Sequence, residues 1–222
     1  MKIDPLTERF CKAIEEIRAI TSYKRGVRPA FHPGHVIKTL FYLMDSGPAG
    51  RKVLSKELDL GETSVRSLFR RLKHNGFIEI DRVAGAYLTN KGEELSKTLN
   101  EIMALYKDIK LFNWNNPVLI IISMIPPRNT PVLIIRDKAI SINADAALIA
   151  FIENDELRIP GLPISSTEHH VIEEIIKKIK DKHPLNNCTI IYASLRNTPL
   201  EIEGLYLGYA IAKFYCQRIK YC

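Results

Sequence analysis

The segment from Gly61 to Ile80, GETSVRSLFRRLKHNGFIEI, constrains the fold of this chain more than any other stretch of its sequence. Four apolar residues in it recur at the i, i+3, i+4, i+7 spacing, which places them on one face of a helix. These residues are Val65, Leu68, Phe69 and Leu72. A helix with this pattern buries one face against a core, and its other faces remain exposed to solvent.

A β-hairpin is predicted directly after this helix. Asn75-Gly76 is a favourable left-handed helix end, and the apolar–polar alternation of residues 77–80 is typical of a strand. Residues 81–85 then predict a turn, and residues 86–89 a returning strand. The order of elements is therefore helix, strand, turn, strand.

Two shorter helices are predicted before the amphipathic one. Residues 35–44 form an apolar-rich helix, and residues 51–58 a second, with a tight turn at 59–61. Two helices joined by such a turn are typical of a helix-turn-helix, and the hairpin that follows would be its wing. The sequence thus predicts a winged helix-turn-helix domain.

The solvent-facing side of the amphipathic helix is polar and basic, as the major groove of DNA requires of a helix that binds there. We therefore expect double-stranded DNA as the partner, and Arg82 at the hairpin tip to approach the minor groove or the backbone. The predicted DNA-binding residues are Thr63, Ser64, Arg66, Ser67, Arg70, Arg71, His74 and Arg82. The alternative interpretation is a solvated basic face on a helical domain with no nucleic-acid partner.

The run VLSKELDLGETSVRSLFRRLKHNGFIEIDRVAGAYLTNKGEEL resembles the winged helix-turn-helix of prokaryotic regulators of the MarR and DtxR type. The whole chain resembles, more narrowly, an uncharacterised archaeal family that joins a winged helix to a C-terminal domain of unknown function. This second resemblance depends on RPAFHPGHV at 28–36, GRKVLSKELDLGETSVRSLFRRLK at 50–73, RDKAI at 136–140 and ELRIPG at 156–161. It implies the fold of the N-terminal part as an expectation, and it implies no known activity.

Charge is distributed unevenly along the 222 residues. Residues 1–115 hold 20 Lys and Arg against 14 Asp and Glu, whereas residues 116–222 hold 12 against 11. This asymmetry predicts that the first half alone contacts nucleic acid. We expect an α+β chain with three parts: a helix and basic linker (1–30), the winged helix-turn-helix with a long final helix (31–112), and a mixed α/β effector or assembly domain (113–222).

Two helices flank the predicted DNA-binding domain, and each has apolar residues spaced like the a and d positions of two heptads. Their seams are Leu6, Phe10, Ala13, Ile17 and Ile20, and Leu95, Leu99, Ile102, Tyr106 and Ile109. Both helices could cover their own domain, or they could pair across a two-fold axis in a homodimer, as regulators of this type do on paired half-sites. We favour the homodimer. The segment 21–35 is interpreted as a solvated linker, with a DNA-contacting arm as the alternative.

In the second half, residues 118–125 and 131–135 predict buried strands, and residues 146–152 and 156–159 a hairpin. A helix over 165–182, a strand over 189–194 and a final helix complete this domain. Gly204, Gly208 and Ala212 recur every four residues in the final helix, so we expect it to pack closely on its neighbour.

No phosphate-binding loop, dinucleotide fingerprint, nucleophile elbow or metal-ligand spacing occurs in the chain, so no catalytic residue, cofactor or metal is predicted. His169-His170 is expected at the surface. The best polar cluster lies where a strand leads into a helix N-terminus, a position that favours anions. A small anionic effector is therefore predicted to bind Arg136, Asp137, Ser194, Arg196, Asn197 and Thr198. The alternative for the last four, plain helix capping plus a surface arginine, is slightly favoured.

Three functions follow from these patterns. A transcription regulator with a sensing or assembly domain is favoured. An enzyme with its catalytic residues in 117–222, or a DNA binder without sequence preference, are the alternatives. The N-terminus resembles no signal peptide, and no apolar run approaches the about 20 residues that span a bilayer, so we expect a cytoplasmic protein without membrane contact.

Overall fold

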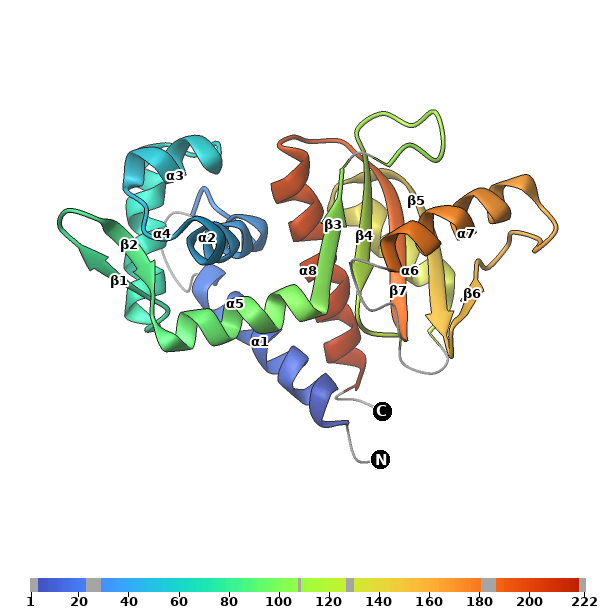
Figure 1. Ribbon diagram of the computed structural model, residues 1–222, viewed down its shortest axis with the longest axis horizontal. Coiled ribbons are helices and arrows are strands. Elements are labelled where there is room, and N and C mark those ends of the chain that lie inside the picture. Colours follow the sequence, from blue (N-terminus) through green and yellow to red (C-terminus); the bar gives the residue numbers. More distant parts are fainter. Residues whose placement is uncertain (1–3, 23–28, 108, 127–129, 181–186, 220–222) are drawn as a thin grey trace. The chain divides into compact units, whose positions relative to one another are not determined.

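The computed structural model describes residues 4–22, 29–107, 109–126, 130–180 and 187–219 (Figure 1). Contacts divide the chain into two compact units, Lys2–Glu101 and Ile102–Cys222, which we call the N-terminal and C-terminal units. The sequence predicted a boundary at residue 113. The observed boundary between the units lies earlier because residues 103–106 form a strand of the second unit's sheet.

Over its described residues, the N-terminal unit consists of five helices and one hairpin. Their bounds are α1 Pro5–Thr21, α2 Pro33–Ser46, α3 Arg51–Glu57, α4 Glu62–His74, β1 Ile78–Asp81, β2 Gly85–Leu88 and α5 Asn90–Ile102. The three predicted helices before the hairpin, and the hairpin itself, are all present within a few residues of the expected bounds. Asn75-Gly76 ends α4 as predicted, with Gly76 at φ +76°.

Local sequence explains how these helices begin. The Asp4 carboxylate accepts a hydrogen bond from the Thr7 backbone N–H at 3.1 Å and so caps α1. His32 caps α2: its Nδ1 accepts from Gly34 N–H, while His35 Nδ1 accepts from His32 N–H, both at 3.2 Å. Two histidines therefore perform the reciprocal capping that a Ser and a Glu commonly provide.

The closing helix of the unit depends on a close approach that Gly92 permits. A Cβ at Gly92 would lie 2.0 Å from the Phe77 carbonyl oxygen. Thr89 caps the same helix, because Gly92 N–H donates to its hydroxyl at 3.1 Å. The Thr89 hydroxyl in turn donates to the Gly76 carbonyl at 2.7 Å. The Thr and Gly of the LTNKGEEL motif therefore fasten α5 to the end of α4 and to the hairpin.

This helix is shorter than expected. It ends at Ile102, and Met103 begins a strand, so Tyr106 and Ile109 do not continue the predicted helical seam. The remaining seam residues of α1 and α5 are buried, except Leu6, which is 46% exposed. The helical spacing that suggested a dimer is therefore accounted for within one chain.

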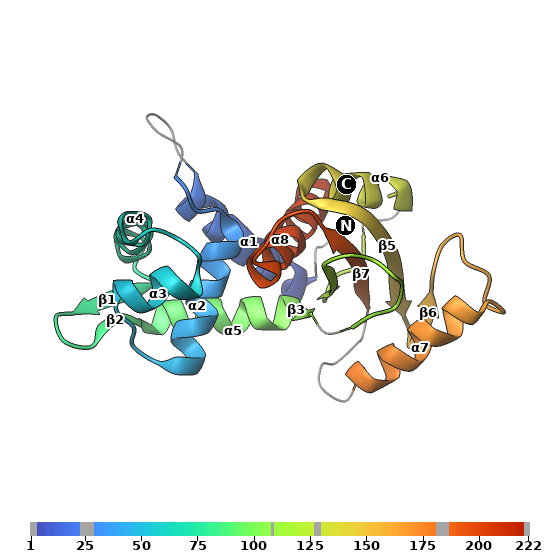
Figure 2. The same cartoon turned by 90° about the horizontal axis from the view of Figure 1, so that it is seen from above.

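The part of the C-terminal unit that the structure describes is a five-stranded sheet with three helices, seen from above in Figure 2. Its elements are β3 Met103–Tyr106, β4 Pro117–Ile122, α6 Val132–Ile142, β5 Ala144–Glu153, β6 Glu156–Arg158, α7 Thr167–Lys180, β7 Cys188–Leu195 and α8 Leu200–Ile219. The strand order is β3-β4-β7-β5-β6, and every neighbouring pair is antiparallel. The expected mixture of helices and strands is confirmed.

All eight residues of β7 are buried, because it lies in the middle of the sheet with helices on both faces. Ile172, Ile176 and Ile179 of α7 pack with one face of the sheet, and α8 packs on the other (Figure 2). A Cβ at Gly208 would lie 3.2 Å from Ile120 of β4, so the predicted close packing of the final helix is present.

The apolar run at 131–135 was expected to be a strand, and this prediction is wrong. It begins α6, in which Ile135 and Ala139 are buried while Leu133 and Ile134 are 58% and 38% exposed. The strands adjacent to β7 are β4 and β5, and α6 packs on β5 and α8. A short apolar run does not distinguish a strand from a helix when flanking contacts are unknown.

Candidate nucleic-acid interface

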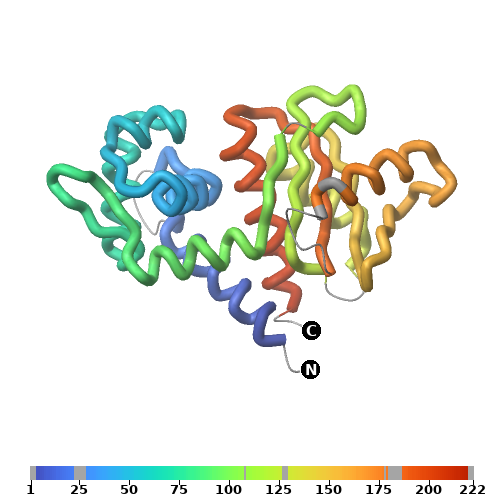
Figure 3. The backbone as a smooth tube through the Cα atoms, viewed as in Figure 1, coloured from blue at the N-terminus to red at the C-terminus, as the bar shows by residue number. Residues whose placement is uncertain are grey.

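The fourth helix has the two faces that its sequence predicts. Val65, Leu68, Phe69 and Leu72 are buried. On the opposite side, Arg66 and Arg70 are exposed, and Ser64 and Ser67 are partly exposed. The chain from this helix through the hairpin to α5 can be followed in Figure 3. The apolar stripe thus fixes the helix to the unit and leaves the polar side accessible.

A groove runs between α4 and the hairpin. Its floor includes Phe69 and Ala86, which are buried, and Ile80, which is 44% exposed. Five cationic residues from three elements line it, namely Arg51, Arg66, Arg70, Lys73 and Arg82. Their convergence comes from the tertiary structure, since α3, α4 and the hairpin tip each contribute to the set.

The acidic residues near this groove stay ionised, and each makes local hydrogen bonds. Asp81 Oδ1 accepts the backbone N–H groups of Val83 and Ala84, both at 2.7 Å, and these bonds hold the pKa of Asp81 below its ordinary value. Lys73 Nζ donates to Glu79 at 2.8 Å, and this hydrogen bond lowers the pKa of Glu79. The positive charge of Lys73 is therefore partly compensated by Glu79.

The four arginines of the groove differ from Lys73 in this respect. Within the described residues, Arg51, Arg66, Arg70 and Arg82 form no ion pair with an acidic side chain. Unpaired guanidinium groups keep their donors available for phosphate oxygens or base edges. The groove therefore has the charge that a polyanion requires.

A second concave surface lies along the N-terminal half of α4. It is lined by Pro29, Ala30, Phe31, Thr63, Ser64, Arg66, Ser67 and Arg70. Five of the predicted DNA-binding residues thus share one surface, and Arg66 and Arg70 also belong to the groove. Arg82 lines the groove together with Arg66 and Arg70, and it comes from the tip of the hairpin.

Arg71, also predicted to bind DNA, makes contacts within its own unit. Its Nη1 donates to the carbonyl oxygens of Ile20 at 2.8 Å and Ser22 at 2.6 Å, and its guanidinium lies 5.5 Å from the Phe31 ring centroid. These carbonyls are at the C-terminal end of α1, where a cation is stabilising. Arg71 therefore holds α1 against α4, and its Nη1 donors are used in these two bonds.

Sequence reasoning missed Arg51 as a member of the groove. Arg51 opens α3, directly after a β-bridge between Ala49 and Ala86 that attaches the hairpin to the start of that helix. At Gly85 the backbone has φ +94°, and a Cβ there would lie 2.5 Å from Ala49. Nothing in the local sequence signals this bridge. His74, the last residue of α4, is exposed as expected.

The predicted anion cluster in the C-terminal unit uses its polar groups internally. The Ser194 hydroxyl donates to the Asn115 carbonyl at 2.7 Å, and Arg196 Nε donates to Asp145 at 2.8 Å. Asn197 and Thr198 are exposed just before α8. Arg136 and Asp137 were expected to join this cluster if 131–135 were a strand beside β7. They lie instead on α6, exposed and 3.7 Å apart.

Two further side chains bear on possible chemistry in this unit. His169 is 5% exposed, in contrast to the expected surface position, because its side of α7 faces inward while His170 faces solvent. Cys188 is a free, buried thiol whose pKa burial raises to about 11, so it is a poor nucleophile near neutral pH. In the described ranges, no three His, Cys, Asp or Glu side chains are grouped as metal ligands.

Residues 34–94 match the model of the family described as PH0730-like, N-terminal domain. The structure is similar to the hypothetical protein PH0730 from Pyrococcus horikoshii OT3, with a TM-score of 0.59 and 26% sequence identity, over 83% of this chain and 92% of that one. Comparison with curated proteins gives no match. These findings support the resemblance to an uncharacterised archaeal family. None of the described helices is long and apolar enough to cross a membrane.

Proposed function

We propose that the N-terminal unit is a winged helix-turn-helix domain that binds double-stranded DNA, and that the protein is a transcription regulator. In this proposal, α3 and α4 are the helix-turn-helix, α4 enters the major groove, and the β1–β2 hairpin is the wing. One observation carries the proposal. Four arginines with no acidic partner among the described residues converge on one groove from α3, α4 and the hairpin, and Arg66 and Arg70 continue onto a surface with Thr63, Ser64 and Ser67.

The arrangement suits DNA in two ways. Hydroxyl and guanidinium donors on one helix face can contact both phosphates and base edges in a major groove. The apolar stripe of α4 keeps that face outward, so binding needs no rearrangement of the helix. The role of Arg82 is to contact the backbone or the adjacent minor groove.

The test replaces Arg66 and Arg70 together by Ala and measures duplex binding by fluorescence anisotropy. Each arginine that reads a base contributes about 1–3 kcal/mol of discrimination, so the double variant should lose at least about tenfold in affinity. The matched control is Arg136→Ala with Arg158→Ala, which removes the same charge from exposed positions of the C-terminal unit. Equal affinity of the Arg66/Arg70 variant and the wild type would refute the proposal.

A DNA binder without sequence preference is the second candidate, because the same cations would bind any duplex. Selection from a random duplex library separates the two. A regulator enriches a motif, and the Arg66/Arg70 variant relaxes that motif at defined positions. A non-specific binder enriches none, and the variant weakens all duplexes alike while reducing the salt dependence of binding.

The C-terminal unit is proposed to serve sensing or assembly. Its net charge is +2 against +5 for residues 1–101, so it adds little to attraction for DNA. Exposed Leu133 and Ile134 on α6 are the apolar side chains that an assembly surface would use. The homodimer stays a prediction without support from the α1 and α5 seams, since those seams are largely buried in one chain.

A further inference from the structure

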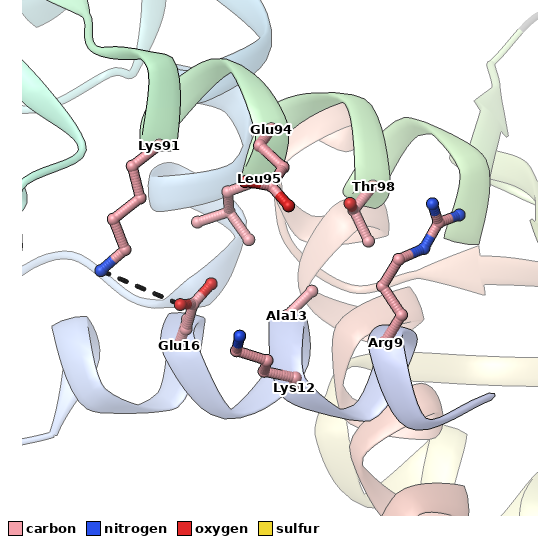
Figure 4. Close-up of a pocket in the computed structure, with 8 residues that line it drawn as sticks. All are labelled: Arg9, Lys12, Ala13, Glu16, Lys91, Glu94, Leu95 and Thr98. Atoms are coloured by element: carbon pink, nitrogen blue, oxygen red, sulfur yellow. Dashed lines mark ion pairs between the residues drawn. The ribbon is translucent and has the colours of Figure 1, made fainter. Parts of the chain in front are cut away.

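A small cavity lies within the N-terminal unit, between α1 and α5, and no part of the proposed DNA interface uses it (Figure 4). Arg9, Lys12, Ala13 and Glu16 of α1 face Lys91, Glu94, Leu95 and Thr98 of α5 across it. Its volume is about 130 Å³. One water needs roughly 10–15 Å³ and drug-sized ligands occupy about 300–1,000 Å³, so the cavity suits a small metabolite.

The charges around this cavity are partly paired already. Arg9 forms an ion pair with Glu101, and Lys91 Nζ lies 3.9 Å from Glu16. Lys12 and Glu94 have no ion-pair partner among the described residues. They lie on opposite helices, and Figure 4 shows the Glu94 carboxylate directed into the gap between them. The two available charges are therefore one cation and one anion.

The floor of the cavity supplies the remaining contacts. Ala13 and Leu95 are each 3% exposed and offer an apolar surface. Thr98 is 6% exposed, and its hydroxyl makes no hydrogen bond within the described part of the chain. The hydroxyl is not one of the fully buried side-chain oxygens that lack a partner, so it is accessible to a molecule bound in the cavity or to water. These features together describe a site for a small molecule that has both charges and a short apolar group.

We propose that this cavity binds a small aliphatic α-amino acid as its zwitterion. The carboxylate would bind Lys12, the ammonium group would bind Glu94, and the side chain would contact Ala13 and Leu95. A simple anion would leave Glu94 unpaired, and a simple amine would leave Lys12 unpaired, so the zwitterion is favoured over either. The Thr98 hydroxyl can donate to the carboxylate.

Two contacts connect the cavity to α4. Lys91, on the cavity wall, donates to the Asn75 carbonyl at the end of α4 at 3.0 Å and lies 4.2 Å from the Phe77 ring centroid. Arg71 of α4 holds the end of α1 through Ile20 and Ser22. An amino acid that bridges α1 and α5 therefore stabilises the two helices that position α4. We expect this stabilisation to increase DNA affinity, and this expectation rests on the proposed DNA-binding function.

The test is calorimetric titration of the full chain, without DNA, using glycine, L-alanine, L-valine and L-leucine as probes. We expect 1:1 binding of at least one of them. For L-valine, isovalerate lacks the ammonium group and isobutylamine lacks the carboxylate, and each should bind at least about tenfold more weakly. Lys12→Gln and Glu94→Gln should weaken amino-acid binding to the same extent.

The matched controls are Glu93→Gln and Lys97→Gln, which alter the neighbouring exposed pair on α5, 3.5 Å apart, and should leave binding unchanged. No binding of any probe at millimolar concentration would overturn the proposal, and so would binding that is indifferent to both Lys12→Gln and Glu94→Gln. Neither result depends on DNA.

A second arm measures duplex affinity with and without the amino acid that binds. An increase supports the coupling, and the amino acid must then bind more tightly by the same factor when DNA is present. Unchanged DNA affinity would overturn the proposed coupling to DNA binding, but the amino-acid site itself would still stand. Absence of DNA binding under all conditions would refute the proposed function, while the calorimetric arm still decides on the cavity.

Discussion

At the scale of single residues, His35 shows how burial of a titratable side chain determines a response to pH. Burial, and then the charge of neighbouring His32, lower the pKa of His35 to about 3. In the unfolded chain a histidine titrates near pH 6.5. The unfolded state therefore binds a proton below about pH 6.5 that the folded state excludes until about pH 3. Stability is fully present above pH 6.5 and is lost as the pH falls.

We predict that His35→Gln removes much of this acid sensitivity. A glutamine oxygen can accept the His32 N–H as His35 does, but it does not titrate. Near pH 5, the wild type should have lost about 2 kcal/mol of unfolding free energy through this one residue. Urea denaturation at several pH values between 5 and 7.5 measures the slope. The assignment would be contradicted if unfolding free energy depended on pH as steeply in His35→Gln as in the wild type. It would also be contradicted if the control His74→Gln reduced this dependence as much as His35→Gln does.

Arg71 is the other residue whose role depends on its surroundings. In the sequence it flanks the polar face of the helix as Arg66 does, and nothing local assigns the two arginines different roles. In the structure it donates to two carbonyls of α1, whereas Arg66 and Arg70 have no ion-pair partner in the described ranges. The position of a neighbouring helix, not the residue type, separates a structural arginine from a candidate DNA-binding one.

At the scale of elements, α5 and α6 show how tertiary contacts override local pattern. The helical spacing of α5 continues to Ile109, but the chain becomes a strand at Met103 because Met103–Tyr106 pair with residues 119–122 of β4. The run that begins α6 has strong β propensity and is nevertheless helical. Propensity is a weak prior, and pairing or packing partners elsewhere in the chain decide the outcome.

The attachment of α5 to the hairpin gives a prediction at this scale. Gly92→Ala should destabilise the N-terminal unit by about 2–3 kcal/mol, although alanine favours helices, because the new methyl group would collide with the Phe77 carbonyl. Thermal unfolding of the two proteins measures the difference. Gly61→Ala is the control, since a Cβ there meets nothing within 4 Å, and loss of a glycine cap costs less than about 1 kcal/mol. Equal stability of Gly92→Ala and wild type would show that α5 can move away.

At the scale of the whole molecule, charge and fold divide at nearly the same place. Residues 1–101 have 18 Lys and Arg against 13 Asp and Glu, and residues 102–222 have 14 against 12. The four arginines of the groove all belong to the first unit. A polyanion should therefore contact the N-terminal unit and leave the helices of the C-terminal unit unchanged.

Hydrogen–deuterium exchange with a bound duplex tests this division. We predict slower exchange in α4 and in the β1–β2 hairpin, and unchanged exchange in α6 and α7. The double variant Arg66→Ala with Arg70→Ala is the control and should show little protection at the same DNA concentration. Protection of α6 and α7 as strong as that of α4 would mean that the C-terminal unit also contacts DNA.

The sequence by itself determined the N-terminal elements from α2 to β2, because each has a strong local signal. The apolar stripe defines α4, Asn75-Gly76 ends it, and the alternation after it defines the hairpin. The polar face of α4 was also readable, since helical periodicity assigns each residue to a side. In the C-terminal unit, β5, β7 and α8 followed from similar signals.

Only the tertiary structure decided the rest. It placed Arg51 and Lys73 in the groove, left Arg71 out of the lining, and placed Arg136 on a helix instead of the expected strand. It also produced the cavity between α1 and α5, whose residues are about 80 positions apart in the sequence. The physical reason is common to all of these. Periodicity fixes the direction of a side chain relative to its own helix or strand, whereas a site depends on which distant element packs beside it.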